Sequence, residues 1–147
     1  MVSSAPVHTA EETWGSDRWY SSVGEDHLCD LTKRLQEEIA KDFCETYGMK
    51  ANVLRAGHIV DGRAGVDPKG RPLDHLTYCE GGWICRHDLA RACCLALTLE
   101  ADGFLALPLI GSRRGYERFR VAETESRLGF RLECDFTRYA GKKAHIA

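Results

Sequence analysis

A helix, a glycine and a strand in direct succession, residues 26–57, constrain the fold of this chain more than any other stretch. Apolar side chains recur at helical spacing before Gly48, at positions 28, 31, 35, 39 and 43. This pattern predicts an amphipathic helix over 26–47 whose apolar stripe faces a core. Gly48 occupies the place where helices commonly end in a left-handed residue. The run from Ala51 to Leu54 then predicts a buried parallel strand, and Gly57 follows at its carboxyl end, where open α/β sheets hold their ligands.

Composition narrows the class of protein. The chain has 147 residues, of which 44% are hydrophobic and 29% charged, and its formal net charge is −2. These values are typical of a soluble globular protein. A net charge of −2 creates no positive electrostatic potential that would attract nucleic acid or an anionic membrane. The longest apolar run, 104–110, is too short to span a bilayer, and the first residues lack the features of a signal peptide. We therefore expect a cytoplasmic protein with no nucleic-acid or membrane partner.

The seven cysteines do not suggest a disulfide framework, because their number is odd and no secretory signal is evident. Cys79, Cys85, His87, Cys93 and Cys94 crowd one segment, but their spacing fits none of the paired C-x-x-C patterns of zinc sites. The sequence therefore predicts reduced, mostly buried thiols and no metal site.

The second half of the chain alternates loops, strands and helices. We expect an irregular loop over 61–73, a strand over 81–86, a helix over 88–100, a strand over 104–110, a helix over 121–128 and a last strand over 131–136. In the helix over 88–100 the inward residues are expected to be Leu89, Cys93, Ala96 and Leu97. Pro108 indicates that its strand lies at an edge or carries a bulge.

Four segments, in order along the chain, carry a family resemblance. Residues 2–8 (VSSAPVH) resemble a strand end that supplies a catalytic Ser or Thr, and LTKRLQEE resembles the helix of a Y-x-x-x-K pair. GWICRHDLARA resembles a "V-H-V-x-D-x-A-x-A" segment, and AETESRLGF resembles a closing "LG-[WF]" helix. Together they are similar to the C-terminal half of the extended short-chain dehydrogenases, the NAD-dependent epimerase/dehydratase family.

This resemblance implies an α/β fold: a partial Rossmann-like parallel sheet with a small α/β substrate lobe. It divides the chain into a remnant of an NAD(P)-binding domain over 1–60 and a substrate-binding lobe with a returning strand over 61–147. The implied activity is that of an NAD- or NADP-dependent epimerase, dehydratase or dehydrogenase acting on a sugar or nucleotide sugar. No glycine-rich G-x-x-G-x-x-G turn is present, so we expect a truncated enzyme that is inactive alone. The alternative is a non-catalytic binding or vestigial descendant.

The resemblance also assigns site residues. Ser4 takes the position of the catalytic serine and Lys33 that of the lysine, which also binds the cofactor, while Cys29 stands where the family has its tyrosine. A thiol ends about 4 Å short of a tyrosine hydroxyl, so the sequence predicts that Cys29 does not replace it.

Further positions carry over from the family. Ala56, Gly57 and His58 match a segment that passes the nicotinamide, and Arg86 and Arg113 are candidates for substrate binding. The helix over 26–47 commonly belongs to a dimer interface in the family, which implies a homodimer through this helix.

Overall fold

The computed structural model describes residues 1–4, 25–75, 82–112, 116–117 and 119–139. Its centre is a parallel sheet of three strands in the order β1-β2-β5, formed by β1 (Val2–Ser4), β2 (Ala51–Ala56) and β5 (Phe104–Leu109). A second parallel pair joins β3 (His58–Val60) to β4 (Trp83–Cys85). The protein is thus a small α/β fold, as expected.

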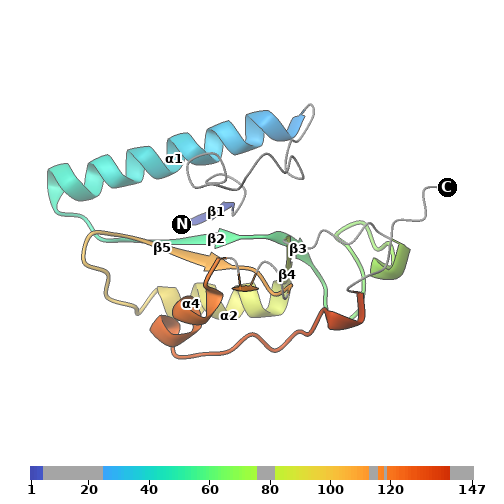
Figure 1. Ribbon diagram of the computed structural model, residues 1–147. Coiled ribbons are helices and arrows are strands. Elements are labelled where there is room, and N and C mark those ends of the chain that lie inside the picture. The colour runs from blue at the N-terminus through green and yellow to red at the C-terminus, as the bar shows by residue number, and fades with distance from the viewer. Residues whose placement is uncertain (5–24, 76–81, 113–115, 118, 140–147) are drawn as a thin grey trace.

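Helices cover both faces of the three-stranded sheet (Figure 1). The long helix α1 (Glu25–Tyr47) lies over one face, whereas α2 (Arg86–Ala96) and α4 (Val121–Leu128) lie over the other. Two short 3-10 helices, η2 (Leu73–His75) and η3 (Thr137–Tyr139), complete the regular elements of the described residues. The residue bounds of α1, β2 and α4 confirm three predictions from the sequence.

The main apolar core lies between the sheet and the helices α2 and α4. Alternate residues of β2 and β5 point toward it, because side chains alternate between the faces of a strand. Its buried members are Leu54, Ala56, Ile84, Leu89, Ala92, Leu107, Leu109, Leu128 and Phe130. This cluster contains residues from both sides of the domain boundary expected after residue 60, and the division into two domains stays a prediction.

A second core lies beside the β3-β4 pair. Trp83 meets Phe136 and Tyr139 edge-on, with ring centroids 5.8 and 5.4 Å apart. Val60, Leu73 and Cys85 complete the buried cluster. Such ring arrangements are favourable because the positive edge of one aromatic ring meets the negative face of another. The end of the described chain is thereby held against β4.

The predicted orientation of α1 is wrong. The described side chains of the predicted apolar stripe are exposed rather than directed to a core: Leu31, Leu35, Ile39 and Phe43 are each between 46% and 58% exposed. Tyr47, one turn further along, is 68% exposed as well. Only Leu28, the first stripe position, lies outside the side chains that the structure describes. The side of α1 that meets the sheet is instead mainly polar, with Cys44 as its buried apolar member.

An ion pair explains this orientation. Glu37, fully buried, faces the sheet and accepts hydrogen bonds from Nε and Nη2 of Arg55 on β2, at 3.2 and 2.8 Å to the same carboxylate oxygen. One turn later, Lys41 places its ammonium 5.5 Å from the ring centre of Phe104 on β5. Because a buried carboxylate needs a charged partner, Arg55 determines which side of α1 is turned inward.

The helix α2 ends earlier than predicted. Asn52 of β2 donates from Nδ2 to the carbonyl oxygens of Ala96 and Leu99, at 2.9 and 2.7 Å. These bonds satisfy carbonyls that a helix end leaves without a partner, and the helix stops at Ala96. Leu97, predicted to face inward, follows the helix and is 87% exposed.

The strand predicted over 131–136 is also wrong. This segment is extended, but three consecutive backbone N–H groups donate to carboxylates instead of to a neighbouring strand. Leu132 donates to Glu125 Oε1 at 2.7 Å, and the next two residues, Glu133 and Cys134, donate to the two oxygens of Asp88 at 3.0 Å each. Side chains have thus replaced the ladder that would define a strand.

Three other predictions are confirmed. Gly48 has a φ of +64°, as a left-handed helix end requires. Residues 61–73 form turns stabilised by isolated bridges and local hydrogen bonds. Pro108 lies in β5, which is an edge strand of the sheet within the described residues. In those same residues we find no helix with the length and apolar character that crossing a membrane requires.

Glutamates 37 and 38 offer a matched test of the buried ion pair. We expect Glu37→Gln to lower the free energy of unfolding by about 2 kcal/mol, since it removes a buried charge-assisted contact. Glu38, whose exposed side chain pairs with Lys41, is the control, and Glu38→Gln should change the same quantity by less than about 0.5 kcal/mol. Urea unfolding followed by circular dichroism measures both, and equal effects of the two substitutions would contradict the assigned orientation of α1.

Candidate functional site

The carboxyl ends of the parallel strands meet at one edge of the sheet. Ser4 of β1 is in register with Ala56 of β2, which is in register with Leu109 of β5. The ends of the three strands are therefore level, as in open α/β sheets that hold a ligand there. The structure brings two of the predicted site positions, Ser4 and Ala56, to this edge.

Lys33 lies over β1. Its ammonium donates to the carbonyl oxygen of Val2 and to Gln36 Oε1, at 3.3 Å each. The helix runs opposite to the strands, because only residues 48–50 connect its end to the start of β2. The N-terminal end of α1 therefore lies toward the carboxyl ends of the strands.

Cys29, predicted to stand at the tyrosine position, precedes Lys33 on α1. Four helical residues separate Lys33 from Cys29, a rise of about 6 Å. The two steps from Val2 to Ser4 cover about 6.6 Å. Position 29 thus lies on the side of Lys33 that is nearer the carboxyl end of β1, and the side chains of Cys29 and Ser4 are outside the described part of the structure.

The segment predicted to pass a nicotinamide has a structural role of its own. The side chain of Ala56 is buried in the main core. The backbone N–H of His58 donates to the carbonyl oxygen of Gly82, and a Cβ on Gly57 would collide with that same oxygen. Gly57 is thus required for the approach of β3 to the chain before β4, and the imidazole of His58 is exposed.

Arg86 forms an ion pair with Asp61 while its side chain stays 61% exposed, with 2.7 Å between Nη2 and Oδ2. His87 Nε2 lies 3.5 Å from the other oxygen of Asp61. Arg86 is thus held in place and still accessible to an anion. Arg113, the other predicted substrate ligand, lies outside the described residues.

Asp61 organises this part of the molecule, and the sequence analysis gave it no role. Its Oδ1 accepts the backbone N–H groups of Ala64 and Arg63, at 2.9 and 3.1 Å. The bond from Ala64 lowers the pKa of Asp61 most, burial opposes it, and the charge of Arg86 adds to the lowering. An aspartate before a glycine-rich turn, as in DGRAG, is the signal that predicts such an arrangement.

Comparisons of this chain with protein-family models, with curated proteins and with solved structures found no match.

The lowered pKa of Asp61 predicts a pH dependence. The folded state favours the carboxylate, so Asp61 stabilises the protein above its ordinary pKa of 3.8, and this contribution is lost as the pH falls through the lower folded value. We expect Asp61→Asn to lower the melting temperature at neutral pH and to flatten its dependence on pH between about pH 5 and pH 3. Thermal denaturation across this range measures it. Asp102→Asn, at an exposed aspartate, is the control, and an unchanged slope in Asp61→Asn would refute the assignment.

Proposed function

We propose that this protein is an oxidoreductase of the NAD-dependent epimerase/dehydratase type, acting on a sugar or nucleotide sugar with NAD or NADP in the cytoplasm. The observation that carries the proposal is the placement of Lys33, which contacts β1 one helical turn from position 29 and beside the strand that ends at Ser4. The parallel order β1-β2-β5, with helices on both faces, supports a Rossmann-like sheet.

The residues around Lys33 suit part of a cofactor site. An ammonium group has three N–H donors, and Lys33 makes two hydrogen bonds within the described residues. Within the described residues we find no third acceptor for this ammonium, and we assign its remaining donor to a ribose hydroxyl. When bound, the nicotinamide would supply the hydride chemistry, while the positive charge of Lys33 favours the deprotonated form of a group at position 29.

The remaining roles follow from the same proposal. The hydroxyl of Ser4 hydrogen-bonds the reacting oxygen of the substrate. Gly57 and His58 lie at the strand end beside the cofactor, and contribute through the backbone and an exposed imidazole. Arg86 offers its exposed guanidinium to an acidic group of the substrate. At position 29 a thiol ends about 4 Å short of a tyrosine hydroxyl, so proton transfer there requires an intervening water and is slow.

A specific observation favours a second candidate, a non-catalytic protein that acts by association. The exposed apolar residues 31, 35, 39, 43 and 47 form one ridge of i+4 spacing along α1, which we call the α1 ridge. Five large apolar side chains on one face are typical of an interaction surface. We propose that a second copy of the chain covers this ridge, in agreement with the homodimer that the resemblance implies.

Two properties of α1 suit self-association. Rows of i+4 side chains on two helices interdigitate when the helices cross, and a two-fold axis lets the same ridge serve both copies. One flank of the α1 ridge is basic near its start, at Arg34, and acidic further along, at Glu38 and Asp42. An antiparallel crossing therefore brings opposite charges together.

The oxidoreductase proposal is tested by cofactor binding. We expect weak binding of NADH or NADPH, with a Kd on the order of 1 mM, measured by saturation-transfer NMR. Lys33→Met should weaken this binding about tenfold, since a hydrogen bond to a charged group is lost. Lys41→Met, at another lysine of α1 that contacts the sheet, is the matched control. The absence of saturable binding in the unchanged chain, or equal affinities of the two variants, would contradict the proposal.

The association proposal is tested by sedimentation. The native chain should sediment with twice the monomer mass of 16.5 kDa, and Leu35→Glu and Ile39→Glu should each weaken the dimer at least about a hundredfold. Leu97→Glu, at an exposed leucine that directly follows α2, the helix on the other face of the sheet, should leave the dimer intact. A monomeric native chain, or dissociation by Leu97→Glu alone, would exclude the α1 ridge as the interface.

A further inference from the structure

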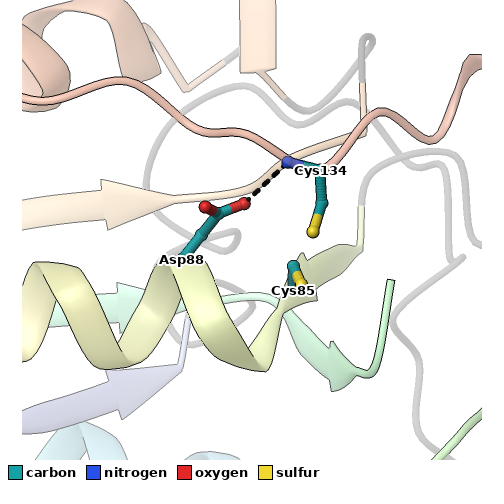
Figure 2. A group of neighbouring side chains, drawn as sticks. All are labelled: Cys85, Asp88 and Cys134. Atoms are coloured by element: carbon teal, nitrogen blue, oxygen red, sulfur yellow. Dashed lines mark hydrogen bonds between the residues drawn. The ribbon is translucent and has the colours of Figure 1, made fainter. Parts of the chain in front are cut away.

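Two cysteines and an aspartate come together on the side of the sheet away from α1 (Figure 2). Cys85 is the last residue of β4, Asp88 lies in the first turn of α2, and Cys134 belongs to the extended segment after α4. One ligand atom from each, two sulfurs and a carboxylate oxygen, all lie within 4.8 Å of one another. Figure 2 shows the sulfur of Cys134 directed toward Cys85.

The backbone holds this cluster in place. Cys134 lies 46 residues after Asp88, and its N–H donates to Asp88 Oδ2 at 3.0 Å, while the N–H of Glu133 donates to Oδ1 at 3.0 Å. Each carboxylate oxygen keeps a second lone pair. Cys85 and Asp88 are buried and Cys134 is partly exposed. The cluster is therefore preorganised on two elements and open to solvent on the side of Cys134.

From this geometry we infer that Cys85, Asp88 and Cys134 form a binding site for a thiophilic divalent cation of the Zn²⁺ class. Two thiolates and a carboxylate suit such an ion, which prefers sulfur ligands and tetrahedral geometry. Tetrahedral bonds of standard length require ligand atoms about 3.6–3.8 Å apart. Rotation of the cysteine side chains brings atoms within 4.8 Å to that separation. The fourth position, on the exposed side of Cys134, takes water or an external ligand.

The binding step balances without an oxidant. Two S–H bonds break, two metal–sulfur bonds form, and both protons leave to solvent, while the carboxylate of Asp88 coordinates without proton transfer. The bound site carries one net negative charge, from two thiolates, one carboxylate and a divalent ion. Arg91 lies beside the site, with its Nη1 3.8 Å from Asp88 Oδ1, and the same nitrogen also pairs with the carboxylate of Glu133.

The prediction of no metal site rests on the spacing of cysteines and histidine within one segment, residues 79–94. Cys134 supplies the ligand that the segment lacks, and it comes from a different part of the chain. Cys93 and Cys94, which the segment does contain, are not members of the cluster.

Cadmium titration of the reduced protein under anaerobic conditions tests the inference, with Cd²⁺ as the probe because its thiolate complexes absorb in the ultraviolet. We expect a sulfur-to-metal charge-transfer band that saturates with one tight-binding ion, with release of two protons per ion in a weakly buffered solution. Cys134→Ser should lower the affinity at least about a hundredfold, more than the loss of an outer-shell partner does. Cys93→Ser, at a partly buried cysteine of α2 outside the cluster, is the matched control and should bind as the native chain does.

Two further variants, each checked for folding, separate the loss of a metal ligand from a loss of structure. Cys85→Ala removes the buried thiol without adding a polar group to the core, and Asp88→Asn preserves the shape of the third ligand. Circular dichroism verifies that each is folded before titration. The inference is overturned if the native chain gives no charge-transfer band or no proton release. Equal loss in Cys134→Ser and Cys93→Ser, or a disulfide between Cys85 and Cys134 in place of metal binding, overturns it as well.

Discussion

The ion pair between Glu37 and Arg55 determines how the upper layer of this fold is built. A carboxylate that is completely buried cannot remain ionised without a cation beside it, and Arg55 of the central strand provides one. Because Glu37 faces the sheet, the rotation of α1 about its own axis is fixed. Lys33, one turn before Glu37, is brought over β1, and Lys41, one turn after it, over Phe104. The α1 ridge is left on the outside.

The two faces of the sheet are therefore stabilised differently. Below it, Leu54, Leu107 and their neighbours form a continuous apolar core with α2 and α4, which provides the non-directional stabilisation of hydrophobic burial. Above it, contacts between α1 and the strands are mainly polar and depend on geometry. Association through the α1 ridge would bury apolar surface on α1 itself, so it would strengthen the layer that has the least apolar contact with the rest of the chain.

The sequence predicts elements well where local signals determine them. The apolar spacing over 26–47, the glycine at position 48 and the alternation in β2 depend on the backbone itself, and these elements form as expected. Prediction from the sequence fails where a side chain that is distant along the chain determines the local structure. An apolar stripe shows that a helix is amphipathic, but only the position of Arg55 shows which side meets the sheet. Asn52 likewise ends α2, and carboxylates of Asp88 and Glu125 accept the bonds that a last strand would need.

The same distinction applies to the candidate sites. Ser4, Cys29 and Lys33 are predictions from the order of residues along two short segments. The structure shows the ammonium of Lys33 at the carbonyl oxygen of Val2, and the roles of the three residues stay predictions. Asp61 is also a local signal, an aspartate before a glycine turn. The cluster of Cys85, Asp88 and Cys134 has no such signal, because it exists only when the extended segment crosses the start of α2. A carboxylate that accepts two consecutive N–H groups from a distant segment brings the side chains of that segment with them. Asp88 thus accepts the hydrogen bonds that a neighbouring strand would otherwise accept. By the same bonds it brings the sulfur of Cys134 to the sulfur of Cys85.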